Sequence, residues 1–78
     1  MSSKGKPIII TEHAQQRLRE MRQQAITVDD IVAAATSIPG MIVTATRFRG
    51  FIAASGRPFD LVVKDLSDRR VVITVIGK

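Results

Sequence analysis

A histidine and an arginine one helical turn apart are the residues whose types and spacing best suit acid–base chemistry. His13 is the one histidine of the 78 residues, and Arg17 follows it four positions later. The imidazole can take or give a proton near neutral pH, and the guanidinium can hold a phosphate group. Together they could cleave RNA without a metal ion, but arginine cannot exchange protons, so the second proton-transfer group would be Glu20, a lysine or solvent. The alternative interpretation is that both side chains are exposed on the helix surface, where they cap or solvate its first turn and have no catalytic role.

Three further arginines occupy the acid-free stretch between residues 30 and 60. Arg47, Arg49 and Arg57 predict one basic patch that could bind RNA phosphates. The two arginines that flank Phe48 fit a half-buried strand whose phenylalanine points inward and whose arginines point outward. The same pattern would also serve only to keep an open sheet face soluble.

Composition excludes several other classes of site. The chain has no cysteine, which rules out disulfides and a thiol nucleophile, and a single histidine makes a zinc site hard to build. No phosphate-loop or nucleophile-elbow motif occurs, so we expect neither a metal nor another cofactor. The apolar runs are far shorter than the roughly 20 residues of a membrane span, which favours a cytoplasmic protein without a membrane partner.

The elements that must position these residues begin after a basic tail. Residues 1–6 are predicted to be disordered, and residues 7–78 to form a single domain. A first helix is expected over residues 12–25, with Thr11 as its N-cap and a buried stripe made by Ala14, Leu18, Met21 and Ala25.

A second helix is expected to begin after Thr27 and to run to about Ser37. Thr27 and Asp30 have the spacing of a capping box, and the Pro39-Gly40 pair that follows cannot continue a helix.

The remainder of the chain changes to a period of two, which is typical of strands. Short turns separate the expected strands, so we predict antiparallel hairpins over residues 41–48, 51–54, 57–64 and 69–76. The last strand is apolar on both faces, with Val71, Ile73 and Val75 on one and Val72, Thr74 and Ile76 on the other, which places it centrally or at a dimer contact. The predicted fold is α+β, with two N-terminal helices packed on a three- to four-stranded antiparallel sheet.

Four segments of the sequence resemble one known family. They are Ile-Thr-Glu-His-Ala-x-x-Arg-Leu at 10–18, Ile-Thr-x-x-Asp-Ile at 26–31, Gly-Arg-Pro-Phe-Asp-Leu-Val-Val at 56–63 and Val-Val-Ile-Thr-Val at 71–75. The chain resembles, over residues 8–76, small bacterial domains of unknown function with a His-Ala-x-x-Arg-Met helix. That family is similar to the BrnT and RelE toxins of the barnase, EndoU and RelE-like ribonuclease fold. Residues 21–26 replace the family's shorter Arg-x-Arg-Gly-Ile turn, which favours a longer first helix.

The resemblance implies a toxin-like, metal-independent RNA endonuclease. By this resemblance, His13 and Arg17 match the histidine and the arginine of the family's helix motif. Thr74 of the closing strand is implied as a third catalytic candidate. Arg47, Arg49 and Arg57 are the expected phosphate-binding residues. The implied partners are RNA or the ribosome and an antitoxin protein. The alternative is a non-catalytic module that binds a partner protein, or a second copy of itself, through its sheet face.

Overall fold

The computed structural model describes residues 6–20 and 25–78. The predicted tail therefore lies outside the described residues, except for Lys6. Within these two ranges, six elements follow one another: β1 (Ile8–Ile10), α1 (Glu12–Leu18), α2 (Val28–Ser37), β2 (Thr46–Ile52), β3 (Pro58–Asp65) and β4 (Arg70–Gly77). The class is α+β, as the sequence predicts.

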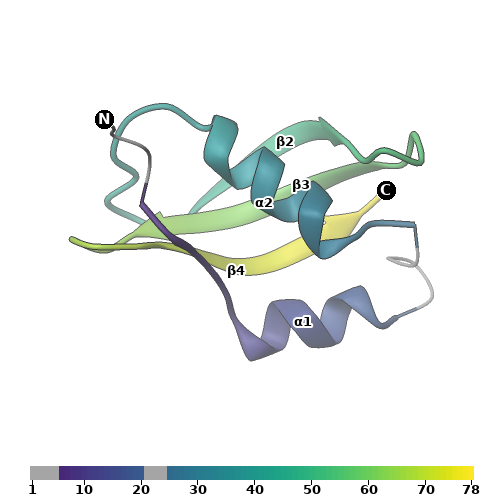
Figure 1. Cartoon of the computed structure of the whole chain (residues 1–78), viewed down its shortest axis with the longest axis horizontal. Coiled ribbons are helices and arrows are strands. Elements are labelled where there is room, and N and C mark those ends of the chain that lie inside the picture. Colours follow the sequence, from purple (N-terminus) through teal and green to yellow (C-terminus); the bar gives the residue numbers. More distant parts are fainter. Residues whose placement is uncertain (1–5, 21–24) are drawn as a thin grey trace.

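The four strands form one mixed sheet in the order β1-β4-β3-β2. β4 is central, which confirms one of the two positions expected for it. The prediction of a purely antiparallel sheet is wrong at one place, because β1 pairs with β4 in parallel. A parallel pair needs a long connection, and here residues 11–69, which form both helices as well as β2 and β3, separate the two strands. Figure 1 shows α2 lying across the sheet and α1 running beside β4.

The first helix is shorter than its apolar periodicity predicts. α1 ends at Leu18, and the cap residue Arg19 donates its backbone N–H to the carbonyls of Gln16 and Arg17. Ala14 is fully buried and Leu18 packs against the core, but Ala25 lies in a turn and Met21 lies outside the described residues. Packing against the sheet, rather than the repeat of apolar residues, sets the length of so short a helix.

The second helix confirms its capping prediction. Thr27 Oγ1 accepts the N–H of Asp30 at 3.1 Å, and Asp30 Oδ2 accepts the N–H of Thr27 at 2.9 Å. Its buried face consists of Ile31, Ala34 and Ala35, which join the hydrophobic core.

One continuous strand replaces the first two predicted strands. β2 stays paired with β3 across Gly50, where the register shifts between Phe48 and Phe51. Gly50 has φ of 85°, a left-handed conformation that glycine adopts without steric cost, so the chain gains one residue there as a bulge. The bulge keeps Phe48 and Phe51 on the same face, where both pack against the core.

A second bulge corrects the predicted faces of the last strand. Val62 and Val63 of β3 pair with Thr74 and Val72 of β4, so Ile73 is an extra residue. Strict alternation groups Val75 with residues 71 and 73, but the bulge places it on the face of Val72, and these two valines are fully buried. The period-two pattern fails here because a bulge changes the phase of a strand without changing its composition.

Candidate nucleic-acid interface on the open sheet face

The helices leave one side of the sheet uncovered, and we call this side the open face. Phe59, Leu61 and Val63 of β3 point into the core, so residues 60, 62 and 64 point the opposite way. Strand pairing extends this face to the neighbouring strands. Its polar members are Arg47, Arg49, Asp60, Lys64, Thr74 and Lys78, and its apolar members are Ile9, Ile52, Pro58, Val62, Val71, Ile73 and Ile76.

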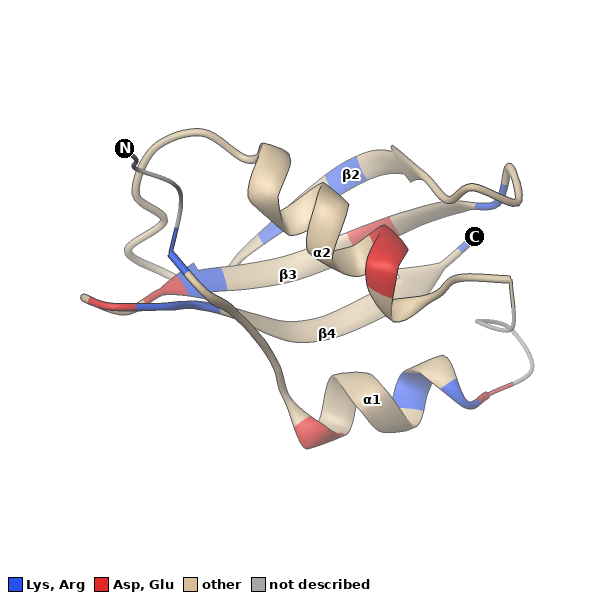
Figure 2. Ribbon diagram, viewed as in Figure 1, with Lys and Arg blue, Asp and Glu red and all other residues tan. Residues whose placement is uncertain are grey.

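Three site candidates, Arg47, Arg49 and Thr74, fall on this face. Arg47 pairs with Val62, and Val62 pairs with Thr74, so the three residues form one row across β2, β3 and β4. Adjacent strands lie about 4.8 Å apart, which puts Arg47 and Thr74 within reach of one bound group. Arg49 follows on β2 and is exposed. Figure 2 shows the basic segments of β2 and the basic end of β3 along the sheet.

A buried carboxylate underlies this row. Asp60 is 0% exposed, and its Oδ2 accepts hydrogen bonds from Arg47 Nε at 3.0 Å and Nη2 at 2.8 Å. Its Oδ1 accepts the backbone N–H of Gly50 at 3.2 Å, and Lys78 Nζ lies 3.3 Å from Oδ2. Two cations therefore share one carboxylate, and the group as a whole keeps a positive charge.

The carboxylate of Asp60 stays ionised at neutral pH. Burial raises its pKa, but hydrogen bonds from Arg47, Gly50 and Lys78 outweigh burial and hold the pKa below its ordinary value. The negative charge is thus permanent under physiological conditions, and it is fully covered by its donors.

The helix candidates lie elsewhere. His13 is exposed on α1, and Arg17 Nη1 forms an ion pair of 3.4 Å with Glu20 Oε1. Among residues 6–20 and 25–78, no hydrogen bond or ion pair joins His13 or Arg17 to the candidates on the open face. The structure therefore separates the predicted catalytic pair from most of the predicted phosphate-binding residues.

One contact brings the start of α1 to the rim of the open face. Thr11 caps the helix, and its hydroxyl donates to the carbonyl of Ile73 at 2.9 Å. Ile73 is the bulge residue next to Thr74. The first turn of α1, which includes His13, is therefore anchored beside Thr74.

The third basic candidate is part of a loop. Arg57 lies between β2 and β3 and is half-buried, and its buried Nε has no hydrogen-bond partner among the described residues. Its backbone carbonyl accepts the N–H of Ala53, which closes the hairpin. This arginine is thus less available than Arg49 for a ligand on the open face.

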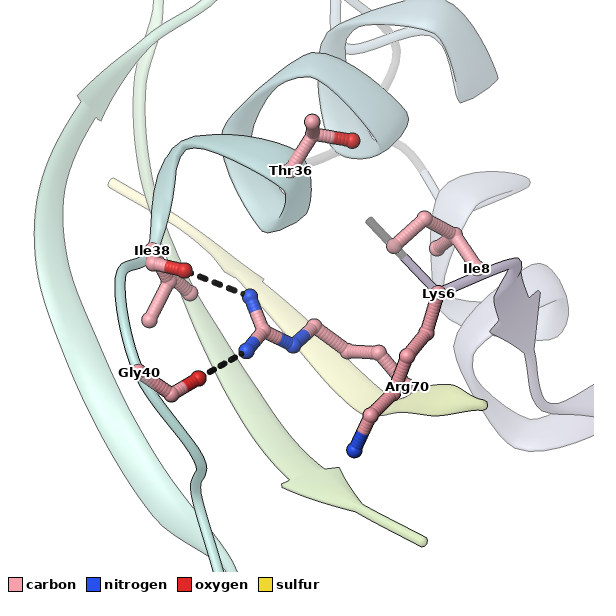
Figure 3. Close-up of a pocket in the computed structure, with 6 residues that line it drawn as sticks. All are labelled: Lys6, Ile8, Thr36, Ile38, Gly40 and Arg70. Atoms are coloured by element: carbon pink, nitrogen blue, oxygen red, sulfur yellow. Dashed lines mark hydrogen bonds between the residues drawn. The ribbon is translucent and has the colours of Figure 1, made fainter. Parts of the chain in front are cut away.

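A pocket of about 250 Å³ on the other side of the molecule holds a buried arginine, Arg70. Figure 3 shows its guanidinium reaching the carbonyls of Ile38 and Gly40 at the end of α2. The remaining N–H groups donate to the carbonyl of Ala35 and to both oxygens of Asp65. All five guanidinium donors are satisfied within the protein, so this arginine has none left for a ligand.

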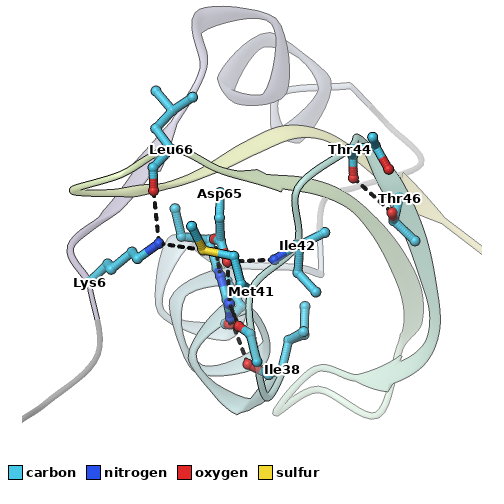
Figure 4. A network of polar contacts seen from close by, with 11 residues as sticks. Lys6, Ile38, Met41, Ile42, Thr44, Thr46, Asp65 and Leu66 are labelled. Atoms are coloured by element: carbon cyan, nitrogen blue, oxygen red, sulfur yellow. Dashed lines mark hydrogen bonds and ion pairs between the residues drawn. The ribbon is translucent and has the colours of Figure 1, made fainter.

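The residues around the pocket form a polar network that joins the ends of several helices and strands (Figure 4). Asp65 Oδ2 accepts the N–H of Ile42 at 2.9 Å, and Lys6 Nζ donates to the carbonyl of Leu66 at 2.8 Å. The hydrogen bonds from Arg70 are the largest influence on Asp65 and lower its pKa to about 2. These contacts stabilise the fold.

Within residues 6–20 and 25–78, no three histidine or acidic side chains lie close enough to hold a metal ion. In the same part of the chain, no helix is long and apolar enough to cross a membrane.

Three charged residues of the open face were not among the sequence candidates: Asp60, Lys64 and Lys78. Asp60 lies within the Gly-Arg-Pro-Phe-Asp segment but was given no role, and Lys64 and Lys78 lie outside the quoted motifs. The alternation of β3 gives a signal for the first two, since an Asp and a Lys opposite the buried Phe59, Leu61 and Val63 must share the other face. The position of Lys78 depends on the β4 bulge, which the sequence does not reveal.

Comparisons with protein-family models, with curated proteins and with solved structures give no match.

Proposed function

We propose that the open face binds the phosphate backbone of single-stranded RNA. The observation that carries this proposal is the sign of its charge: the exposed charged side chains described on this face are all cationic, and its one carboxylate, Asp60, is 0% exposed beneath Arg47. Charge of one sign on one face attracts a polyanion and speeds its association.

The other residues of the face suit the sugar and the bases. The hydroxyl of Thr74 stands in one row with Arg47 and can donate to a phosphate oxygen or a ribose hydroxyl. Apolar side chains such as Val62 and Ile76 offer a surface on which unpaired bases can pack. The three phenylalanines face the core, so base stacking contributes little, and binding should depend strongly on salt and weakly on sequence. The proposal places this activity in the cytoplasm.

Fluorescence anisotropy with a labelled single-stranded RNA tests the proposal. Arg49→Ala should weaken binding about five-fold. The number of ionic contacts derived from the salt dependence of the binding constant should fall by about one. Arg19→Ala is the matched control, because it removes an exposed arginine from the end of α1 and should change binding less than two-fold. Equal losses in both variants would show that only net charge matters and would overturn the assignment to the open face. An acidic partner protein, such as an antitoxin, or a second copy of the chain would then be the better candidate for this surface.

We also propose a second function, RNA cleavage at the rim of the open face, because Thr11 anchors the first turn of α1 beside Thr74. His13 would accept the proton of a ribose 2′-hydroxyl, whose oxygen attacks the phosphorus, while Arg17 stabilises the added negative charge. The 5′-oxygen would leave with a proton from Glu20, a lysine or solvent. The reaction needs no metal ion.

RNA integrity separates cleavage from binding alone. Purified wild-type protein should shorten single-stranded RNA in the presence of a chelator, and His13→Ala should abolish this activity without weakening binding. Gln16→Ala, an exposed change on the same helix, should cleave like the wild type. Intact RNA with the wild type, in buffer and with added ribosomes, would overturn the cleavage proposal and leave RNA binding standing.

A further inference from the structure

The guanidinium of Arg47 is held on one side only. Its Nε and Nη2 both donate to Oδ2 of Asp60, and no described residue accepts a hydrogen bond from its Nη1. The side chain remains 40% exposed, whereas the carboxylate beneath it is fully buried. Arginine can bind one carboxylate through its side edge and present its end to a second anion.

The carboxylate itself is fixed by the sheet. Asp60 sits within β3, and its second oxygen accepts the N–H of Gly50 at 3.2 Å. That N–H belongs to the bulge of β2, where the left-handed conformation of Gly50 interrupts regular pairing. The bulge, the carboxylate and the guanidinium thus form a chain of contacts that ends at the surface.

Lys78 reinforces the positive side of this arrangement. Its Nζ lies 3.3 Å from the same oxygen of Asp60 and its side chain is 43% exposed. Two cations share one carboxylate, so one positive charge at the surface remains uncompensated. This charge can bind the single negative charge of an RNA phosphate.

We infer that Asp60 is a positioning residue, which orients Arg47 so that the free end of its guanidinium, with Lys78 beside it, forms a binding site for one RNA phosphate. The inference rests on the proposed function and deepens it, because it locates one phosphate subsite on the open face. A buried ion pair is weak support for stability, so a role in orienting an exposed arginine accounts better for this carboxylate.

The sign of one mutational effect tests the inference. Asp60→Asn raises the net charge by one, so electrostatics alone predicts tighter RNA binding. Positioning predicts the opposite, a loss of about five-fold or more, because Arg47 is no longer held. Asp68→Asn is the matched control: it makes the same change of charge at an exposed carboxylate of the β3–β4 turn, and binding should be unchanged or slightly tighter. Equal or tighter binding by folded Asp60→Asn would overturn the inference.

Arg47→Lys gives a second test that leaves Asp60 itself unchanged. Lysine keeps the charge but has no planar fork, so it cannot hold Asp60 and a phosphate with separate edges. Binding should fall about three-fold or more, whereas Arg49→Lys should bind within two-fold of the wild type. Equal binding by both lysine variants would contradict a role for the oriented guanidinium.

An NMR measurement on the free protein separates this inference from the proposed function. The Nε–H of Arg47 should exchange with water more slowly than that of Arg49, and the difference should vanish in Asp60→Asn. Equal exchange rates in the wild type would overturn positioning, whatever RNA does. A slow Arg47 Nε–H in a protein that fails to bind RNA would instead refute the proposed function and support positioning by Asp60.

Discussion

Arg47 and Arg70 each bind an aspartate through Nε and Nη2, as Arg69 also does, and the burial of the first two gives them different roles. Arg70 is 8% exposed and uses every N–H group on Asp65 and on backbone carbonyls near the end of α2. Arg47 keeps 40% of its side chain in solvent. The sequence identified Arg47 as a phosphate-binding candidate, and the alternation of β3 placed Asp60 on the open face. It gave no reason to pair Asp60 with Arg47 or to select Arg70, because side-chain pairing between strands depends on register.

Arg70→Met should reduce the free energy of unfolding by about 3–5 kcal/mol, because it leaves a buried carboxylate and several carbonyls without a partner. That loss is as large as the whole stability expected for a domain of this size. Chemical denaturation measures the effect, with Arg69→Met as the control. Arg69 is exposed and, within the described part of the chain, its side chain pairs only with exposed Asp68, so its loss should cost less than about 0.5 kcal/mol. A similar cost for both variants would contradict the structural role of Arg70.

At the scale of elements, the sequence correctly predicted the helix cap, which involves neighbouring residues. It did not predict where the first helix ends or which face each residue of the last strand occupies. The capping box of Thr27 and Asp30 was confirmed, because both partners lie within one turn. The first helix, in contrast, ends at Leu18 although apolar residues continue at helical spacing. The bulges at Gly50 and Ile73 depend on how neighbouring strands pair. A glycine within a strand is a signal for the first, but no residue pattern within β4 indicates the second.

Asp30→Ala should cost about 1–2 kcal/mol of unfolding free energy, since this side chain does two tasks. One oxygen completes the cap of α2, and the other accepts the N–H of Ala54 at 3.0 Å, which fastens the β2–β3 loop to the helix. Asp29→Ala removes the neighbouring acidic residue of the same turn and should cost a few tenths of a kcal/mol. Thermal unfolding of the two variants should separate them, and equal melting temperatures would refute the dual role of Asp30.

The whole molecule has one covered and one open side, and this asymmetry was only partly predictable. Two amphipathic helices beside strands such as β3 indicated that the helices would cover one face. The sequence predicted one basic patch and placed His13 and Arg17 on the first helix, but it did not reveal that these two groups lie apart. That division arises from the strand order, which places β2 at the sheet edge far from β1.

The fold should lose stability in acid. The pKa of Asp65 is lowered from 3.8 to about 2, and hydrogen bonds also lower the pKa values of Asp60 and Asp30. A carboxyl group with a depressed pKa in the folded state stabilises the fold above its ordinary pKa. The contribution of Asp65 should therefore be complete above about pH 5 and disappear as the pH falls from about 4 to about 2. Denaturant titrations at several pH values measure this, and an unfolding free energy that stays constant down to pH 2 would contradict it.

The central claim, that the open face binds RNA, is tested most directly by NMR titration of the labelled protein with a short single-stranded RNA at low salt. The account predicts that the amide signals of residues 47–50, 60–64 and 74–78 change most when RNA is added, and that these signals return to their original positions when salt is added. The exposed side of α2, represented by Val32 and Ala33, should not respond. Shifts confined to the helices, or no shifts at all, would contradict the claim.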